Sequence, residues 1–372
     1  MQKKIKVLMI LPNLRVSSGV VSFAMNYFRA IDHRKIQMDF AIFWDVPTPN
    51  YDEIKTNGGK VYILPSIKDI KEHSHVCEHI IQKGNYDIVH DNTLLVSMVL
   101  MYYARKYNVP VRILHSHSSK LGETELKGFR NKLFMPFLRS MATDYCACST
   151  VAAKGMFGNK KVIIIPNIIS TDRYIFSQET REKVRKKFNV SGSFLVGTVG
   201  RLAAPKNPFY AIDCIVEAKK IISNLQYWWI GTGPLNEQVK EYVSKKEAGV
   251  YIHLLGSRID IPELYQAMDM FFLPSHFEGL PLTGLEAQAS GLPCLVSDAV
   301  SNEFVYTDQV SFFSLRDSVD KVCCMIQQVQ AKADEKRRET SKVKLLSSPF
   351  SDKGAGEQLT LVYKRLLSQH EK

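Results

Sequence analysis

The sequence predicts two doubly wound α/β domains that face each other across a cleft. The chain has 372 residues, and at about 150 residues per domain this length suggests two cores. Short apolar runs rich in β-branched residues alternate with stretches whose apolar positions recur every three or four residues, which predicts parallel strands joined by helices. The runs lack an in/out alternation, as expected for strands buried on both faces of a sheet.

The first half supplies the strands of an N-terminal domain, expected over residues 1–170. The strand-like runs are 5–11, 38–43, 60–64, 86–90, 111–115, 144–148 and 161–165. Helical periodicity lies between them, for example over Val20–Ile31 and Ile67–Ile81. This alternation is typical of a parallel sheet covered by helices.

The second half repeats the pattern and predicts a C-terminal domain over residues 171–352. Its strand-like runs are 194–200, 226–231, 250–256, 270–274, 293–297 and 310–315. The segment 166–176 and a charged helix over Ser177–Phe188 are interpreted as the crossover. The charged run 331–344 is interpreted as a solvated helix or linker without chemistry. A helical stretch over Gly354–Ser368, within residues 353–372, is expected to pack back on the first domain.

Composition is ordinary for a soluble globular protein, with 45% hydrophobic and 23% charged residues. No apolar run approaches the roughly 18–20 residues that span a bilayer. The apolar run near the N-terminus is short, meets Pro12 and lacks a small-residue cleavage site, which favours a buried strand over a signal peptide. The seven cysteines show no paired metal-site spacing. We therefore expect a cytoplasmic protein with reduced thiols.

Positive charge is concentrated in the first half. Residues 1–170 contain 23 Lys and Arg against 13 Asp and Glu, an excess of ten, whereas residues 171–372 contain 26 against 24, an excess of two. Such an excess indicates an anionic partner: a phosphate-bearing substrate, an acidic membrane surface or nucleic acid. A basic surface kept for solubility is the alternative. Nucleic acid is not expected as a partner, because the aromatic residues form core-like strands and no exposed stacking platform.

Chemistry is expected in the loops beyond the carboxyl ends of the strands, where open α/β sheets bind ligands. After the first strand, Ser17, Ser18 and Gly19 let the backbone approach a ligand at a helix start, whose N–H groups favour an anion. After the strand 111–115, His115 and His117 lie two residues apart. We expect them to point in opposite directions if the extended geometry persists, one facing the cleft and the other packing inside; a purely structural role is the alternative.

The second domain opens with two cations on a strand–helix loop. Arg201 leaves the strand end and Lys206 starts the next helix. A planar fork and a point charge suit a diphosphate, although two solvated surface cations would look the same. The following strand ends in a Gly-x-Gly turn, Gly231 to Gly233, which is a weak signal for a nucleotide on its own.

Two carboxylates, Glu278 and Glu286, flank the start of a later helix. Gly279 and Pro281 make a continuous helix between them improbable, so the helix is expected to begin near Leu282 or Thr283. Glu278 then lies in the loop and Glu286 in about the first helical turn. Both carboxylates could face one bound molecule, with helix-start N–H groups for phosphate oxygens between them.

The order of these motifs resembles the retaining GT-B glycosyltransferases of family 4. The motifs that carry the resemblance are the Gly19 loop, HSH at 115–117, PNIIS at 166–170, GRLAAPK at 200–206, GTGP at 231–234 and HFEGLPLTGLEAQASGLP at 276–293. The resemblance covers essentially the whole chain, and it is strongest to bacterial capsule and exopolysaccharide transferases. The chain departs from the family pattern in having Pro-Asn-Ile-Ile-Ser where Pro-Asn-Gly is usual, and one glycine in the first loop.

The resemblance implies a role for each motif. Arg201 and Lys206 would neutralise the donor diphosphate, Glu286 would bind the ribose hydroxyls, and Glu278 would lie near the transferred sugar. His117 would contact the sugar or the acceptor, with His115 as the less favoured candidate. Gly231 and Gly233 would line the nucleobase pocket. Backbone N–H groups along one segment would hold phosphate and sugar oxygens; its residues are Gly279, Leu280, Pro281, Leu282 and Thr283.

The function implied is retaining transfer of a hexose or N-acetylhexosamine from a nucleoside-diphosphate sugar, with UDP the expected nucleotide, to a saccharide acceptor that is expected to be lipid-linked. No cofactor and no metal is expected. The basic first domain, with the segment 127–141, implies peripheral contact with an anionic membrane surface; an ordinary core-facing helix is the alternative. Two rival functions are a nucleotide-sugar epimerase of the same architecture and a catalytically silent partner subunit.

Overall fold

The chain divides into two compact units. We describe a computed structural model that covers residues 4–16, 18–118, 125–332, 338 and 340–370. Unit 1 consists of Met1–Ile168 and Asp352–Lys372, and unit 2 consists of Ile169–Ser351. These divisions lie within two residues of the expected boundaries at 170/171 and 352/353. Unit 2 therefore interrupts unit 1 along the chain, and the chain returns to unit 1 after it.

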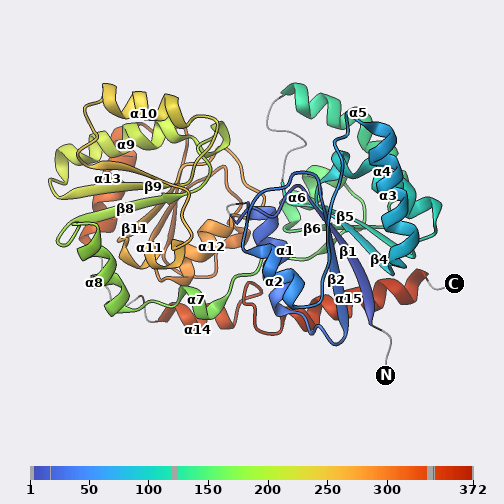
Figure 1. Cartoon of the computed structure of the whole chain (residues 1–372). Helices are drawn as coiled ribbons and strands as arrows, with labels where there is room; N and C mark the ends of the chain where they lie inside the picture. Colours follow the sequence, from blue (N-terminus) through green and yellow to red (C-terminus); the bar gives the residue numbers. More distant parts are fainter. Residues whose placement is uncertain (1–3, 17, 119–124, 333–337, 339, 371–372) are drawn as a thin grey trace. The chain divides into compact units, whose positions relative to one another are not determined.

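Unit 1 is built on a parallel sheet with the strand order β3-β2-β1-β4-β5-β6-β7 in the described part of the chain (Figure 1). Its strands are β1 (Ile5–Leu11), β2 (Ile36–Ile42), β3 (Val61–Ile63), β4 (Ile88–Asp91), β5 (Val111–Ser116), β6 (Asp144–Ala147) and β7 (Ile163–Ile164). Each expected strand of the first half has its counterpart in this sheet. The order reverses between β1 and β4, because β2 and β3 lie on one side of β1 and all later strands lie on the other.

Helices cover both faces of this sheet. They are α1 (Gly19–Ala30), α2 (Asn50–Thr56), α3 (Ile70–Gly84), the short 3₁₀ helix η1 (Leu94–Ser97), α4 (Met98–Lys106), α5 (Glu125–Met141), α6 (Thr150–Phe157) and α15 (Ala355–His370). Along β1, Val7 and Met9 join the core under α1 and α15, whereas Leu8 and Ile10 join the core under α3 and α4. Successive side chains point to opposite faces, so both faces need apolar residues and the run appears continuous in sequence.

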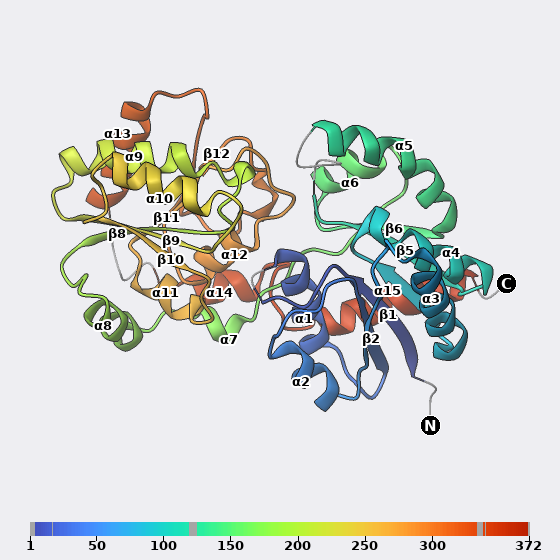
Figure 2. The ribbon, with the colours of Figure 1, turned by 45° about the horizontal axis from the view of Figure 1, so that its top comes forward.

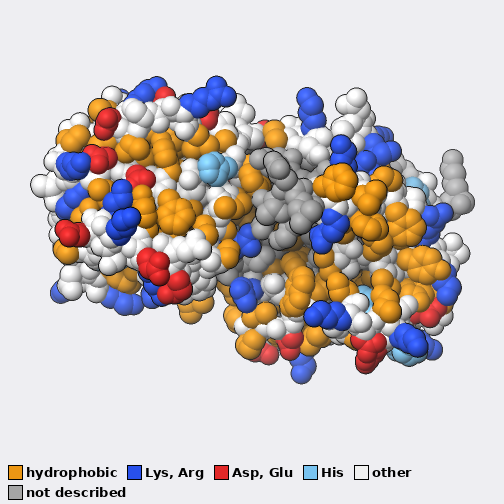
Figure 3. Space-filling model, turned by 90° about the horizontal axis from the view of Figure 1, so that it is seen from above, with side chains coloured by type: hydrophobic (Ala, Val, Ile, Leu, Met, Phe, Trp, Pro, Cys, Tyr) orange, Lys and Arg blue, Asp and Glu red, His pale blue; other side chains and the backbone are white. Residues whose placement is uncertain are grey.

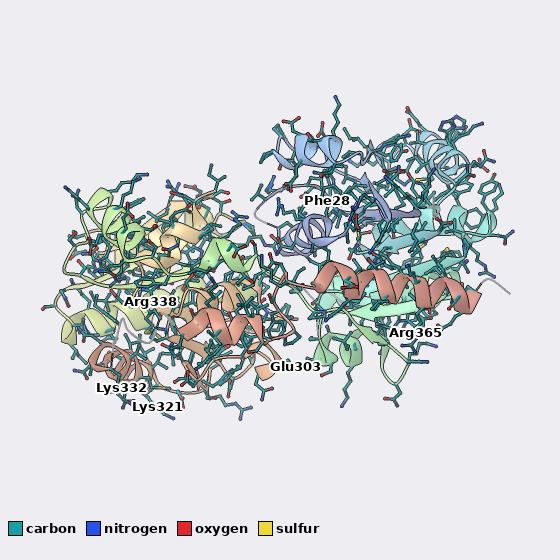
Figure 4. All side chains as sticks on the ribbon, turned by 90° about the horizontal axis from the view of Figure 1, so that it is seen from below. Phe28, Glu303, Lys321, Lys332, Arg338 and Arg365 are labelled. Carbon is teal, nitrogen blue, oxygen red and sulfur yellow. The ribbon has the colours of Figure 1, made fainter. Side chains whose placement is uncertain are left out.

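Helix α15 returns from unit 2 and completes the core of unit 1. It packs against α1 and β5, and it runs across unit 1 in the view of Figure 4, where the exposed Arg365 marks its outer face. Leu359, Tyr363 and Leu366 are buried within the same core as Phe28 of α1. Their spacing of three and four residues places them on one face of the helix.

Helix α5 is apolar on two faces. Met135, Leu138 and Met141 are buried against the core. Elsewhere on the helix surface four large side chains remain exposed: Phe129 (71%), Leu133 (66%), Phe134 (45%) and Phe137 (54%). We call these four residues the α5 apolar stripe. Figure 3 shows hydrophobic side chains gathered over this part of unit 1, with Lys and Arg side chains beside them.

Unit 2 is built on a second parallel sheet, with the strand order β10-β9-β8-β11-β12-β13 among the described residues (Figure 1). Its strands are β8 (Phe194–Val199), β9 (Leu225–Ile230), β10 (Ile252–Gly256), β11 (Met270–Leu273), β12 (Cys294–Ser297) and β13 (Val310–Phe313). The order reverses between β8 and β11. Two doubly wound units, each built on a parallel sheet, are the architecture that the sequence predicted.

Helices also cover both faces of the second sheet (Figure 2). They are α7 (Thr171–Tyr174), α8 (Gln178–Lys187), η2 (Ala204–Lys206), α9 (Pro208–Ile221), α10 (Asn236–Lys245), α11 (Ile261–Ala267), α12 (Leu282–Ala289), η3 (Asn302–Phe304), α13 (Val319–Ala331) and α14 (Ser341–Leu346). Helix α9 contacts both α10 and α13, and α7, α8, α11, α12 and α14 form a second connected group. The core between α9, α13 and the sheet includes Tyr227 and Trp229.

The charged run 331–344, expected to be a solvated helix or linker, is partly buried. Residues 333–337 and 339 lie outside the described residues. Arg338 is only 4% exposed, and its guanidinium donates to the backbone carbonyls of Tyr265, Gln266, Met268 and Ser290. Figure 4 labels Arg338 within unit 2. The solvated interpretation is wrong at this position, because one side chain satisfies carbonyl groups at the ends of α11 and α12.

Within the described residues, we find no helix that is both long enough and apolar enough to cross a bilayer.

Candidate active site

The point where the strand order of unit 2 reverses collects most of the polar residues singled out in the sequence. The loop after β8 carries Arg201 and Lys206, and the loop after the neighbouring strand β11 carries Glu278. The backbone N–H of His276 donates to Pro205 O at 2.8 Å, which ties these two loops together. In doubly wound sheets ligands bind at this reversal, beyond the carboxyl ends of the strands.

Lys206 and Glu278 form an ion pair between the two loops. Lys206 Nζ lies 2.5 Å from Glu278 Oε1, and the two side chains are 17% and 16% exposed. Ser275 Oγ also donates to Glu278 Oε1, at 2.8 Å. A lysine held this way offers two further N–H groups to an incoming anion, since an ammonium has three donors. Arg201 lies five positions before Lys206 on the same loop and is exposed.

The glycines after β9 are required by the neighbouring backbone. Gly231 has φ +134°, and a Cβ there would lie 2.2 Å from Gly200 O. A Cβ on Gly233 would lie 2.2 Å from Leu202 O. The loop after β9 therefore packs directly on the Arg201 loop, which explains the Gly-x-Gly turn without any ligand. Whether the same turn lines a nucleobase pocket stays a prediction.

Glu286 lies on α12 and is held by two tyrosines from other elements of unit 2. Tyr174 Oη donates to Glu286 Oε1 at 2.8 Å, and Tyr265 Oη donates to Oε2 at 3.1 Å. Burial raises the pKa of Glu286 to about 7, although the two hydrogen bonds and the charges of Arg173 and Lys206 act to lower it. Both carboxylate oxygens are thus fixed in place by phenol donors.

Helix α12 begins at Leu282, as the sequence predicted, and Glu286 follows in its second turn. The residues leading into it are buried: Gly279, Leu280, Pro281 and Leu282. Thr283 Oγ1 is also buried, and it has no hydrogen-bond partner in the part of the chain that the structure describes. An unmet buried hydroxyl beside the N–H groups of a first helical turn is a feature that an oxygen-rich ligand would satisfy.

The reversal point of unit 1 gathers histidines. His115 is the last residue but one of β5 and is fully buried, and His117 is the first residue after β5 and is partly buried. Their rings stack at 4.2 Å between centroids with an interplanar angle of 16°. The expectation that they point in opposite directions is wrong, because residues two apart on a strand share a face. Phe23 of α1 meets both rings edge-on, each at 4.7 Å.

The two histidines are held by different partners. His115 Nδ1 lies 2.9 Å from His90 Nε2, and His90 Nδ1 lies 2.8 Å from Tyr363 Oη of α15. His117 Nε2 lies 2.8 Å from Asn92 Oδ1, just after β4. Burial lowers the pKa of His90 and of His117 to about 3 and that of His115 well below its ordinary value. All three imidazoles are therefore neutral at physiological pH.

Gly19 opens α1, and a Cβ at this position would meet no described atom within 4 Å. Neither packing nor backbone geometry therefore requires glycine here, in contrast to Gly231. Ser17 lies outside the described residues.

Sequence reasoning missed the residues that hold the expected ones. Tyr174, Tyr265, Asn92, His90 and Tyr363 each bond a singled-out side chain or its neighbour, across separations of up to 273 residues. Of these, only His90 and Asn92 could have been found, since His90 ends a predicted strand next to the sheet's reversal point and Asn92 follows that strand. The three tyrosines lie in helices without any local signal.

Comparison with known proteins adds a family match. Residues 180–320, within unit 2, match the family described as glycosyl transferases group 1. EpsF of Bacillus subtilis, a protein named as a glycosyltransferase, is 28% identical over 296 residues, which cover 77% of each chain. The UDP-Gal:alpha-D-GlcNAc-diphosphoundecaprenol alpha-1,3-galactosyltransferase of Escherichia coli is 27% identical over 323 residues, covering 80% of each chain.

Solved structures support the fold. HepE of Anabaena, in complex with UDP and glucose, superposes with a TM-score of 0.79 at 16% identity, covering 97% of this chain and 99% of that one. The matched domain, the relatives and the architecture together support the assignment of this chain as a glycosyltransferase with the GT-B fold.

Proposed function

We propose that this chain is a retaining glycosyltransferase that moves a hexose or N-acetylhexosamine from a UDP-sugar to a lipid-linked saccharide, in the synthesis of a cell-surface polysaccharide such as a capsule or exopolysaccharide. The observation that carries the proposal is the arrangement at the reversal point of unit 2. A cationic loop with the Lys206–Glu278 pair and the tyrosine-held Glu286 flank one helix start. They offer partners for the sugar, the diphosphate and the ribose, which follow one another in that order in a nucleotide sugar.

The diphosphate would bind between the loop after β8 and the start of α12. Lys206 and Arg201 supply positive charge, and Thr283 Oγ1 supplies an unmet hydroxyl. As the sugar leaves, negative charge grows on the diphosphate, and fixed cations stabilise that charge without reorganisation. These two cations would do the electrostatic work that a metal does in other transferases, so the reaction is expected to proceed without one.

Ribose would bind at Glu286. Two carboxylate oxygens match two vicinal hydroxyls, since each hydroxyl can donate one hydrogen bond. Tyr174 and Tyr265 fix the direction of those oxygens before the ligand arrives. Pre-organisation of this kind reduces the entropy lost on binding.

Glu278 would stabilise the transferred sugar and would not act as a nucleophile. Its Oε1 already accepts hydrogen bonds from Lys206 and Ser275, and the positive charge of the paired ammonium makes the whole carboxylate a poorer nucleophile. Retention would then follow from attack by the acceptor on the same face from which the diphosphate leaves. A double displacement through a covalent glutamate, as in retaining glycosidases, is not favoured.

The choice of nucleotide and acceptor rests on the relatives. HepE is crystallised with UDP and glucose, and the name of the Escherichia coli relative specifies UDP-galactose and a diphosphoundecaprenol-linked sugar. By analogy, unit 2 would bind the donor. Unit 1, which carries most of the positive excess, would bind the acceptor and its lipid diphosphate.

A melting experiment tests the donor site. Thermal stability is measured with UDP, GDP, ADP and their sugars, with and without EDTA, for the parent, Arg201→Ala and Lys245→Ala. A ligand at a hundred times its dissociation constant stabilises by about 2.7 kcal/mol, so UDP is expected to raise the Tm of the parent. Lys245→Ala, an exposed cation of α10, should respond like the parent, and Arg201→Ala should respond less.

Transfer is tested with the same proteins, a UDP-sugar and a lipid-linked saccharide, by reading the anomeric configuration of the product. A product of inverted configuration would refute retention. Conversion of the donor in the absence of acceptor would favour the epimerase, and absence of any nucleotide response would favour a silent subunit.

A further inference from the structure

The orientation of the Asn92 side-chain amide is fixed by its surroundings. Its Nδ2 lies 3.3 Å from Ile10 O, 3.2 Å from His90 O and 2.8 Å from Met9 Sδ. All three atoms can only accept hydrogen bonds, so the NH₂ group must face them. The opposite orientation would place the amide oxygen against two carbonyl oxygens in a buried site, since Asn92 is 6% exposed.

This orientation leaves Asn92 Oδ1 facing His117. The oxygen lies 2.8 Å from His117 Nε2 and can only accept. His117 Nε2 must therefore carry the proton, and in a neutral imidazole the other nitrogen, Nδ1, then carries a lone pair. No hydrogen bond to His117 Nδ1 is found among the residues that the structure describes. The ring is neutral at physiological pH because burial lowers its pKa to about 3.

The plane of the His117 ring is fixed as well. The ring stacks on His115 and meets the edge of Phe23, and His115 is itself held through His90 by Tyr363 of α15. The ring thus has one orientation and one protonation pattern, both imposed by neighbours. A histidine that binds no ligand has no evident need for a single ring orientation and a single tautomer.

We propose that Asn92 is a positioning residue that holds His117 in its Nε2–H tautomer, so that Nδ1 accepts a hydrogen bond from a sugar hydroxyl of a substrate. This inference rests on the proposed function, since the sugar is a glycosyl substrate. The hydroxyl belongs either to the transferred sugar or to the acceptor. Under this assignment His117 works as a neutral acceptor, and it is not an acid that donates a proton.

Nitrogen chemical shifts of the histidine side chains test the tautomer directly and need no activity. Protein labelled with ¹⁵N-histidine is measured at pH 7 by long-range ¹H–¹⁵N correlation, with His117→Asn used to assign the signals. The expected result is a protonated Nε2 and a bare Nδ1. A protonated Nδ1, or an imidazolium, would overturn the proposal.

Variants at Asn92 test the cause. Asn92→Leu removes the acceptor and should give a mixture of tautomers. Asn50→Leu is the matched control, because Asn50 is also buried, at 5% exposed, and donates to a backbone carbonyl, Leu14 O. It should leave the tautomer unchanged. An unchanged tautomer in folded Asn92→Leu would refute the role of Asn92.

Kinetics test the link to the substrate. Asn92→Leu should lower kcat/KM about tenfold, the effect of one positioning hydrogen bond. In a His117→Ala background the same change should cost less than about twofold, because a residue that acts through His117 has nothing left to position. An equal loss in both backgrounds would overturn the proposal.

The KM values for the two substrates show whether the hydroxyl belongs to the transferred sugar or to the acceptor. A rise in KM for the nucleotide sugar assigns the hydroxyl to the transferred sugar, and a rise in KM for the saccharide assigns it to the acceptor. If the tautomer is as expected and no transfer occurs with any donor, the proposed function fails, while the action of Asn92 on His117 stands.

Discussion

Ionisation of Glu286 has opposite effects on UDP binding and on folding stability. Its carboxyl has a pKa of about 7 in the folded protein against an ordinary value of 4.5, so the folded state binds this proton more tightly than the unfolded state does. The free energy of unfolding therefore falls as the pH rises from 4.5 to 7. Above pH 7 Glu286 is ionised in the folded state, and the cost of holding its buried charge lowers the free energy of unfolding in full. A difference of this size between the folded and unfolded pKa values corresponds to about 3 kcal/mol.

Two opposite trends with pH follow from this group. Ribose hydroxyls prefer the ionised carboxylate, so UDP affinity should increase as the pH rises from 6 to 8. Glu286→Gln should lose most of that increase, and above pH 7 it should unfold at a higher temperature than the parent. Tm values and UDP titrations from pH 5 to 8.5 check both trends. A Tm difference between parent and variant that does not change with pH would show that the Glu286 pKa is not raised.

At the scale of elements, the α5 apolar stripe predicts that this helix binds a membrane surface. Phe129, Leu133 and Phe137 recur at four-residue steps on an exposed face. Arg130 and Lys132 lie beside them, and residues 128–141 contain no acidic side chain. The side chain of Lys127, at the start of the expected segment, lies outside the described residues. An amphipathic surface of this composition suits the interface of an anionic bilayer.

Co-sedimentation with lipid vesicles checks this prediction. The parent should pellet with anionic vesicles at low salt and less with neutral ones. Replacement of Phe129, Leu133 and Phe137 by serine should abolish pelleting. The matched control replaces Val250 and Ile259 of unit 2 by serine, since both are 82% exposed, and it should pellet like the parent. Equal pelleting of the two variants would exclude α5 as the contact.

Secondary-structure elements could be predicted from the sequence, whereas most long-range contacts could not. The strands were predictable because burial on both faces leaves continuous apolar runs, and the start of α12 was predictable from Gly279 and Pro281. The burial of Arg338 was not predictable, because a charged run gives no local sign that one of its side chains will donate hydrogen bonds to distant backbone carbonyls. The bond from Tyr174 to Glu286 spans 112 residues, and only the order of strands in the folded sheet brings such residues together.

At the scale of the whole molecule, the two units differ in their independence. Ile169 pairs with Ser351 in a β-bridge, so unit 2 begins and ends at neighbouring positions and should fold as residues 169–351 alone. Residues 1–168 alone should not fold. They lack Leu359, Tyr363 and Leu366, whose burial contributes about 5 to 9 kcal/mol together, comparable to the whole stability of a domain.

Three fragments measured by circular dichroism and thermal unfolding check this difference. Residues 169–351 should unfold cooperatively and bind UDP, and residues 1–168 should not unfold cooperatively. Residues 1–168 joined to 352–372 by a short Gly/Ser linker should recover a cooperative transition. Cooperative unfolding of residues 1–168 alone would show that α15 is dispensable.

The late position of α15 in the chain also determines the order of events on the ribosome. Strands β1 to β7 emerge first, but α15, which covers one face of their sheet together with α1, follows only after all of unit 2 has been made. Unit 2 can therefore be complete while unit 1 still exposes the surface that receives Leu359 and Tyr363. For that interval the nascent chain carries an open apolar face, the kind of surface that chaperones bind.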